Sequence, residues 1–279
     1  MVRILVDTSS DFELEELRQR NLEYVPMPIQ FEGESLRDVE ELSKEAFYQR
    51  LETQYPTTAQ PSPAEFAAHF QAAKEAGDEI VAIVMSSALS GTYQGACLAK
   101  EDVDYDKIYV VDSLHVTTGA RVLTDYAISL REQGRSGQEI AEAVRALRPR
   151  VKLYAAMDTL EYLYRGGRLS KAAASLGTLA NIKPQIHISD EGKVIITGKS
   201  IGQKRAIAML VERVEKAKLD PAFPVYSIYA NDPSGRNMLL EKLREKGYIA
   251  EESNSNNLGP TIGAHIGPGA TGVVFVTAE

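Results

Sequence analysis

The sequence has no tryptophan and a single cysteine, Cys97. One cysteine excludes an intramolecular disulfide, and a lone thiol is typical of a reducing compartment. Grooves that stack nucleobases or sugar rings use aromatic side chains heavily, so the absence of tryptophan argues against such a groove. We therefore expect a cytoplasmic protein that does not bind nucleic acid.

Long apolar runs are lacking as well. A membrane-spanning helix needs about 20 consecutive apolar residues, and no stretch of the 279 residues approaches that length. The apolar run at Val2–Val6 is too short for a signal peptide and is followed by Asp7. The formal net charge of −8 repels phosphate backbones and anionic lipid surfaces. We expect a soluble chain with no integral membrane association.

The segments that resemble metal or nucleotide sites lack the residue spacing or the neighbouring helix that such sites need. The four histidines have no metal-ligand spacing, so no metal is expected. Gly267–Gly272 matches the dinucleotide pattern but precedes a predicted strand, where a nucleotide site needs a helix. Gly198–Ser200 resembles the end of a phosphate loop, but the preceding glycine, Gly192, lies one residue too far back. We expect no cofactor.

What is present favours an α/β fold. Buried strands are predicted at 2–6, 79–85 and 107–111, with helical patterns between them, which indicates a mostly parallel sheet with helices on both faces. Beyond residue 150 the pattern changes, and a hairpin is predicted at 186–197. We expect an N-terminal α/β domain at 1–150 and a C-terminal mixed α/β domain at 151–279.

Three helix starts are marked by capping signals, one of them at Ser136 and Glu139. Ser62, Pro63 and Glu65 combine an N-cap, a first-turn proline and a capping-box glutamate, and the helix should stop at Gly77. Ser10 and Glu13 form a third possible capping box. We expect a helix to begin at each position.

Polar, hydroxyl-rich loops follow three of the predicted strands, at 7–10, 86–92 and 112–113. The carboxyl ends of parallel strands share one edge of a sheet, so these loops should converge. A helix N-terminus with free amides attracts anions, and Ser90, Gly91 and Thr92 stand at such a start; N-capping alone is the alternative explanation. Thr58 precedes the next helix start in the same way. We expect an anion site here.

Three further residues have open roles. His265 lies in a glycine-rich segment that allows close backbone approach, and it can be structural or functional. Arg168 lies between two predicted short helices, either as a surface charge or as a bidentate donor to an anion. Ser90 with His265 as base and Asp112 as orienting residue would make a hydrolase, although no nucleophile elbow surrounds Ser90. A serine-dependent acyl hydrolase is therefore the alternative function.

Several ordered segments together resemble the DegV family of bacterial fatty-acid-binding proteins. They span the whole chain: Asp7–Ser9, Thr58–Ser62, Leu89–Gln94, Val111–Ser113, Thr159–Leu163, Gly166–Ser170, Asn181–Pro184 and His265–Gly269. Each segment is short, but their order and spacing are specific.

The resemblance implies a two-domain DegV-like (EDD) fold that holds one long-chain fatty acid in a buried tunnel between the domains. Thr58 and Ser90, with Gly91 and Thr92, would hold the carboxylate near His265, and Arg168 or Arg205 would contact the head group or a partner. The chain would be a carrier with no catalytic residues. It would present the acid to a separate ATP-dependent fatty acid kinase, which makes the acyl phosphate.

The sequence departs from the family pattern at two positions. Ala59 stands where relatives commonly have serine, which removes one hydroxyl beside the carboxylate site. Ile201 stands where many relatives have an arginine that helps the kinase step, and Arg205 or Arg168 is a candidate substitute. A buried acyl chain contributes about 0.8 kcal/mol per methylene, so the tail supplies affinity and the head group orients.

Overall fold

The computed structural model describes residues 1–171 and 181–278, and contacts divide the chain into two compact units. Unit 1 consists of Met1–Ser43, Thr58–Pro149 and Asp190–Gly192. Unit 2 consists of Lys44–Thr57, Arg150–Ser189 and Lys193–Glu279. The sequence predicts one division at residue 150, whereas the contacts also place 44–57 with the second half and 190–192 with the first.

Unit 1 is built on a four-stranded parallel sheet. Its strands, in the spatial order β2-β1-β6-β7, are β2 (Leu22–Val25), β1 (Val2–Asp7), β6 (Glu79–Val84) and β7 (Ile108–Asp112). All three strand pairs are parallel. Five of the six residues of β6 are buried, because helices cover both faces of the sheet and leave no solvent-facing row.

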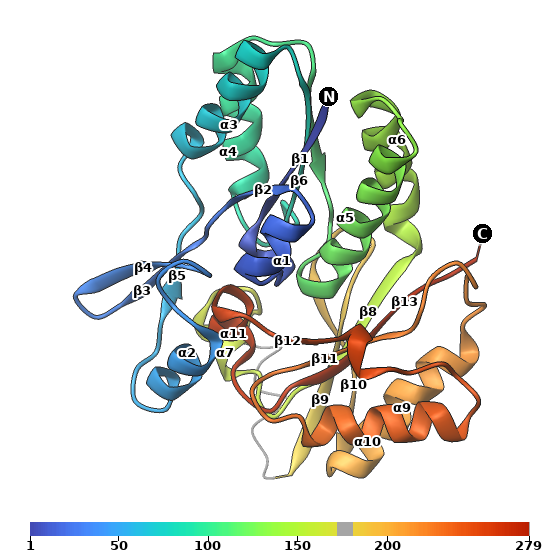
Figure 1. Cartoon of the computed structure of the whole chain (residues 1–279). Helices are drawn as coiled ribbons and strands as arrows, with labels where there is room; N and C mark the ends of the chain where they lie inside the picture. The colour runs from blue at the N-terminus through green and yellow to red at the C-terminus, as the bar shows by residue number, and fades with distance from the viewer. Residues whose placement is uncertain (172–180, 279) are drawn as a thin grey trace. The chain divides into compact units, whose positions relative to one another are not determined.

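Four helices cover this sheet, as Figure 1 shows. On one face lie α3 (Pro63–Ala76) and α4 (Thr92–Val103), and on the other α5 (Thr117–Glu132) and α6 (Gly137–Leu147). Phe66, Phe70 and Ala73 recur at helical spacing along α3 and enter the core with Leu5 and Ile80 of the sheet. The predicted parallel sheet with helices on both faces is confirmed.

The capping predictions at Ser62 and Ser136 are confirmed, the latter with the Glu139 amide donating to the Ser136 hydroxyl at 3.3 Å, and the one at Ser10 is wrong. The Glu65 carboxylate accepts the Ser62 amide at 2.8 Å, and α3 ends at Gly77 with φ +70°. Ser10 caps no helix, because its hydroxyl donates to the Asp7 carbonyl at 2.7 Å within the 3₁₀ turn Thr8–Ser10. The following helix, α1 (Leu14–Gln19), has Glu13 as its N-cap.

A small second sheet belongs to the first part of the chain. Strands β3 (Pro28–Phe31) and β4 (Glu34–Arg37) form an antiparallel hairpin, and β5 (Thr57–Thr58) adds a third strand beside β3. Residues 24–29 are divided between β2 and β3. Proline lacks the amide that a continuous ladder needs, which accounts for the break between Val25 and Pro28.

Unit 2 contains a six-stranded mixed sheet. Its strands, in the spatial order β10-β9-β8-β13-β11-β12, are β10 (Val194–Ile201), β9 (Ile182–Ile188), β8 (Val151–Ala156), β13 (Thr271–Val276), β11 (Tyr226–Tyr229) and β12 (Ser255–Asn257). Only β11 and β12 pair in parallel; the other pairs are antiparallel. The predicted hairpin is confirmed, with Val194 opposite Ile188.

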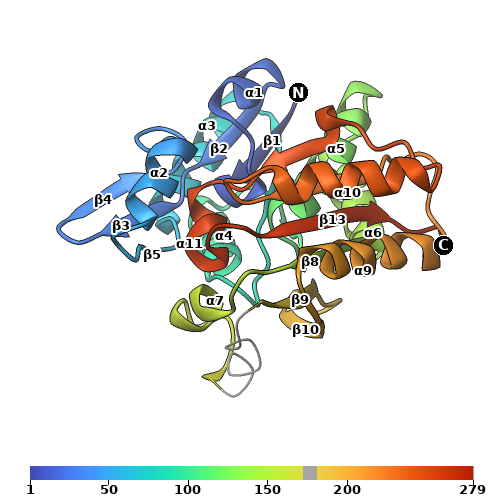
Figure 2. The ribbon, with the colours of Figure 1, turned by 90° about the horizontal axis from the view of Figure 1, so that it is seen from below.

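Helices α9 (Gln203–Lys216) and α10 (Ser234–Glu245) lie side by side in both Figure 1 and Figure 2. Their buried leucines, including Leu210 and Leu239, form one core with Val273 and Phe275 of β13. Short 3₁₀ turns occupy Arg148–Arg150 and Glu252–Asn254. No helix within 1–171 and 181–278 is long and apolar enough to cross a membrane.

Among its described residues, unit 2 also has three short helices: α2 (Lys44–Leu51), α7 (Glu161–Arg165) and α11 (Pro260–Ile266). A side chain on Gly263 of α11 would lie 2.5 Å from the Phe47 ring of α2, so the two helices are in close contact. The Tyr48 hydroxyl donates to the Leu258 carbonyl at 3.0 Å. These contacts explain why 44–57 belong to unit 2. The second short helix predicted after Gly167 continues into 172–180, outside the described residues.

Candidate functional site

The three polar loops of unit 1 meet at the carboxyl end of its parallel sheet. Asp7, the last residue of β1, accepts the backbone amide of Met85 at 2.6 Å through Oδ2. Asp112, the last residue of β7, accepts the amide of Ser87 at 3.1 Å. Carboxylates at two strand ends therefore hold the loop that follows the strand between them. The predicted convergence is confirmed.

Asp7 is fully buried among these loops. Its second oxygen, Oδ1, accepts the Ser9 amide at 2.9 Å. Burial raises the pKa of the Asp7 carboxyl, and the hydrogen bonds from Ser9 and Met85 oppose that rise. Asp11, one turn later, accepts a hydrogen bond from the Thr117 hydroxyl. The segment after β1 is thus fixed by buried hydrogen bonds.

The loop Ser86–Thr92, here called the 86–92 loop, leads from β6 into α4. The Ser86 carbonyl accepts the amides of Leu89 and Ser90 at 3.0 and 3.1 Å. Gly91 is the N-cap of α4, and the Ser90 and Thr92 hydroxyl oxygens lie 2.8 Å apart. The loop therefore presents two hydroxyls and the N-terminus of a 12-residue helix at one place.

The Thr58 segment packs against the 86–92 loop. A side chain on Gly91 would collide with Oε1 of Gln60 and lie 2.8 Å from its Cδ. Thr58 itself is half-buried in β5, and the next residue, Ala59, donates its amide to Pro28 at 3.0 Å. The structure thus brings together, within unit 1, the two segments that the sequence predicts as an anion site.

The sulfur atom of Met27 lies next to the buried Thr92 hydroxyl. The Thr92 hydroxyl lies 3.8 Å from Sδ of Met27, and the Met27 amide donates to the Thr8 hydroxyl at 3.0 Å. Thr92 is fully buried, whereas Ser90 is half-buried. Ser90 is therefore the more accessible of the two hydroxyls.

His265 is the penultimate residue of α11 in unit 2, so the segment predicted only as glycine-rich is helical. Its ring lies against Gly166, where an added side chain would lie 2.8 Å from Cε1. Burial, together with the positive charge of Arg168, lowers the pKa of His265 to about 4. The imidazole is neutral at neutral pH.

Arg168 is half-buried, and its guanidinium donates to the Gly166 carbonyl. Burial lowers its pKa. A half-buried guanidinium is compatible with both roles considered for this arginine, a surface charge and a bidentate donor to an anion. A neutral imidazole beside a guanidinium supplies hydrogen-bond donors suited to an anion.

Arg205 and Ile201 lie on exposed positions of unit 2. Arg205 forms an ion pair with Glu212 at 3.0 Å along α9, a surface pair of small energetic weight. Ile201, at the end of β10, has 76% of its surface exposed. Both positions are open to an external molecule.

The two nucleotide-like segments hold no helix N-terminus. Gly198–Ser200 lies inside β10, and Gly267–Gly272 leads into β13 through two residues with positive φ, Gly267 and Gly269. Within the described ranges, no cluster of three histidine, cysteine, aspartate or glutamate side chains could hold a metal ion.

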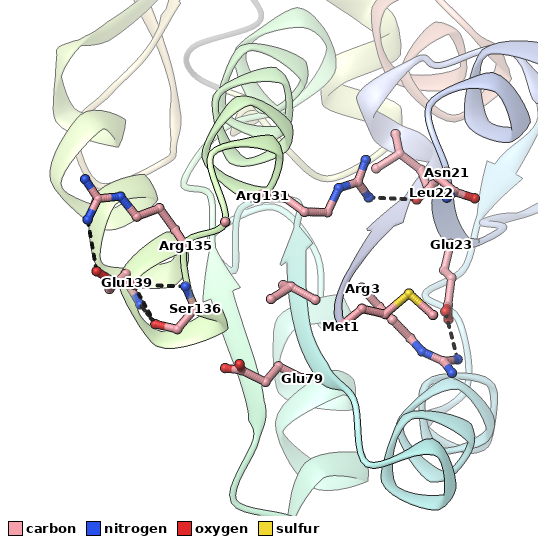
Figure 3. Close-up of a pocket in the computed structure, with 12 residues that line it drawn as sticks. Met1, Arg3, Asn21, Leu22, Glu23, Glu79, Arg131, Arg135, Ser136 and Glu139 are labelled. Carbon is pink, nitrogen blue, oxygen red and sulfur yellow. Dashed lines mark hydrogen bonds and ion pairs between the residues drawn. The ribbon is translucent and has the colours of Figure 1, made fainter.

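A surface pocket of about 760 Å³ opens at the other, amino-terminal end of the parallel sheet (Figure 3). Its charged side chains are paired within unit 1: Arg3 with Glu23, Arg135 with Glu139, and Arg131 with the Asn21 carbonyl. The lining carboxylate Glu79 accepts the Gly137 amide at 2.8 Å. The predicted site residues lie elsewhere.

Two contacts of the 86–92 loop were not predicted from the sequence. Gln60 reaches Gly91, and the turn at Gly192 reaches Ser86. The sequence marks Gly192 only as a hairpin turn, and no local signal connects it with a residue 106 positions away.

Comparison with known proteins gives a consistent result along the whole chain. The family model described as "Uncharacterised protein, DegV family" matches residues 1–278. A DegV domain-containing protein of Caldanaerobacter subterraneus is 35% identical over 276 residues, covering 98% of both chains. One from Clostridium acetobutylicum is 31% identical, covering 99% of this chain and 98% of the relative.

Solved structures of similar fold include two proteins described as binding fatty acids. A DegV family protein from Thermus thermophilus is 30% identical, with a TM-score of 0.88 over 99% of both chains. The protein TM841 from Thermotoga maritima is 28% identical, with a TM-score of 0.82 over 99% of both chains. The predicted fold class is confirmed.

Proposed function

The chain belongs to the DegV family, as its motifs predict, and on that basis we propose that it binds one long-chain fatty acid. We assign the carboxylate to the hydroxyls of Thr58 and Ser90. The observation that carries this proposal is the packing of the Thr58 segment on the 86–92 loop, at the N-terminus of α4. Similar structures described as fatty-acid-binding proteins support the choice of ligand.

The chemistry of the 86–92 loop suits a carboxylate. The first amides of α4 lack intrahelical partners and carry partial positive charge, which favours an anion. Ser90 and Thr92 share one hydrogen bond in which either oxygen can donate. When Thr92 donates, the Ser90 proton is available for a carboxylate oxygen. A charge-assisted bond of this kind is stronger than one between neutral groups.

His265 and Arg168 extend the proposal to unit 2. From the family resemblance we assign His265 a contact with the same head group, and Arg168 a supporting positive charge. A neutral imidazole can donate one hydrogen bond to a carboxylate, and an anion nearby would favour protonation of the ring. Fatty acid should therefore raise the pKa of His265 from its low value.

The protein acts as a carrier in this proposal. It presents the acid to a separate ATP-dependent fatty acid kinase, and it contributes no catalytic group of its own. Exposure of Ile201, at the position where many relatives have an arginine, suits a role for that surface in partner contact. Arg205 and Arg168 are the candidate replacements for the missing arginine.

Native mass spectrometry of the purified protein tests the proposal directly. We expect a complex heavier than the chain by the mass of one fatty acid. Ser90→Ala should weaken binding of a fluorescent fatty acid such as parinaric acid by about tenfold, because one charge-assisted hydrogen bond is lost. Ser87→Ala, in the same loop, is the matched control. A protein that neither carries nor takes up fatty acid would contradict the proposal.

Labelling with a fluorophosphonate distinguishes the alternative acyl hydrolase. The described partner of the Ser90 hydroxyl is Thr92, which is not a general base. The carrier proposal expects no label on Ser90. A labelled Ser90 together with release of free acid from an ester would favour the hydrolase.

A further inference from the structure

The turn between β9 and β10 belongs to unit 1 by its contacts, although both strands belong to unit 2. Its last residue, Gly192, is buried and has φ +76°, a conformation that favours glycine. Hairpin turns are ordinarily exposed and tolerant of substitution. Burial of this turn indicates that it contacts something specific.

The contact is with Ser86, the first residue of the 86–92 loop. The Ser86 hydroxyl donates to the Gly192 carbonyl at 2.9 Å. A side chain on Gly192 would collide with that hydroxyl oxygen and lie 3.1 Å from Cα of Leu114. Glycine suits this position for two reasons: its backbone is left-handed, and it lies too close to Ser86 and Leu114 for a side chain.

Ser86 links the 190–192 turn to Ser90 through hydrogen bonds to both. Its hydroxyl oxygen also accepts the Ala88 amide at 3.2 Å, while its carbonyl accepts the Ser90 amide at 3.1 Å. The Ser86 amide donates to His115 at 2.9 Å. Ser86 is fully buried, so all its polar groups act inside the protein.

Leu114 provides a second support for the same turn. It has φ +51°, which is strained for a leucine, and its amide donates to Asp112 Oδ1 at 3.0 Å. The same oxygen accepts the Ser87 amide. The 190–192 turn therefore rests on both loops that Asp112 holds together.

We infer that the 190–192 turn positions the 86–92 loop for ligand binding, with Ser86 and Gly192 as positioning residues. This inference rests on the proposed binding of a fatty acid carboxylate by Ser90. Ser86 does not touch the ligand; it sets the place of the Ser90 amide through its own backbone. Displacing the turn should therefore weaken fatty acid binding.

Gly192→Ala tests the inference, and Gly33→Ala is its matched control. Gly33 also occupies a hairpin turn with φ +78°, but an added side chain there meets no atom within 4 Å. Both variants strain the backbone similarly, and only Gly192→Ala collides with Ser86. We expect Kd for parinaric acid to rise about tenfold in Gly192→Ala and to stay unchanged in Gly33→Ala.

Ser86→Ala and the double variant complete the cycle. Ser86→Ala should raise Kd by itself, because the Gly192 carbonyl loses its donor. In the double variant the colliding oxygen is absent, so its Kd should be lower than the product of the two single effects predicts. If Gly192→Ala does not fold, Ser86→Ala alone decides the question.

The outcomes separate this inference from the proposed function. Unchanged affinity in Gly192→Ala or Ser86→Ala, or equal weakening in Gly33→Ala, would overturn the inference while fatty acid binding stands. A lowered Tm with an unaltered Kd would show a structural role only and would also overturn it. If the unmodified chain binds no fatty acid, the proposed function itself fails.

Discussion

Asp7 and Met85 are joined by a hydrogen bond of 2.6 Å between a buried carboxylate oxygen and a backbone amide. Asp7 is the last residue of β1, and Met85 directly follows β6, the parallel strand beside it. Met85 directly precedes the 86–92 loop, so this bond fixes the point at which the loop leaves the sheet. The loop's geometry depends on a residue that lies far from it in sequence.

Asp7→Asn should lower the free energy of unfolding by about 1–3 kcal/mol, because a buried amide is left without its acceptor. Asp7 uses both oxygens, one for Ser9 and one for Met85, and asparagine has only one. Urea denaturation at neutral pH measures the difference.

Asp112→Asn is the matched comparison for that substitution. Asp112 accepts the amides of Ser87 and Leu114 through the same oxygen, Oδ1, which asparagine retains. We expect a smaller loss, about 0.5 kcal/mol or less. Equal losses in Asp7→Asn and Asp112→Asn would contradict this account of the two carboxylates.

Gly91→Ala should weaken fatty acid binding more than it lowers stability. The new side chain would displace Gln60, whose long side chain can move aside, and with it the packing of the Thr58 segment. We expect Kd to rise about tenfold in a fluorescence titration. Gly95→Ala, in the same helix, meets no atom closer than 3.8 Å and should bind normally. Similar affinities for the two variants would argue against the Gln60 contact.

His265 should titrate with a pKa of about 4 in the folded, ligand-free protein. The unfolded chain binds this proton near pH 6.5, so the histidine's contribution to stability is complete above that pH and lost as pH falls toward 4. The loss should amount to about 3 kcal/mol, because the pKa falls from 6.5 to about 4 on folding.

Imidazole NMR signals across a pH series measure the pKa of His265, and His265→Gln should flatten the stability profile over the same range. In the proposed complex, fatty acid raises this pKa. A ligand-free value near 6.5 would contradict the burial of the ring beside Arg168.

Ile201→Arg should increase acyl phosphate formation about tenfold when the loaded protein is supplied to an ATP-dependent fatty acid kinase, because it adds a charge-assisted contact. Stability should change by no more than about 0.5 kcal/mol, since the side chain is exposed. Ile195→Arg, on the same strand and also exposed, is the control. An equal gain in both variants would indicate general electrostatic attraction and not a specific role for this position.

Local sequence signals are sufficient to predict the features that depend on neighbouring residues. The capping box at Ser62, the helix stop at Gly77 and the β9–β10 hairpin follow from local hydrogen bonds and backbone preferences. The alternation of strands and helices determined the parallel sheet, and hence the edge at which Asp7 and Asp112 meet the 86–92 loop. The family motifs identified the ligand class that we propose.

Other local signals were overridden by packing. Ser10 resembles an N-cap, yet its hydroxyl bonds to Asp7, because the turn after β1 is buried. The sequence marks the segment before His265 only as glycine-rich, whereas the structure shows a helix there, α11, which contacts Phe47. A buried polar group is destabilising unless it has a hydrogen-bond partner within the protein, so burial changes which hydrogen bonds form. Burial depends on the tertiary structure and not on neighbouring residues.

Contacts between residues distant in the chain follow from packing and cannot be predicted from local sequence. Gln60 against Gly91, Gly192 against Ser86, and Arg168 beside His265 depend on how separate elements pack. The pKa of His265 is lowered only because its ring is desolvated next to a positive charge. Residue types determined which groups could bind an anion, while packing decided which of them are held in place and in which protonation state.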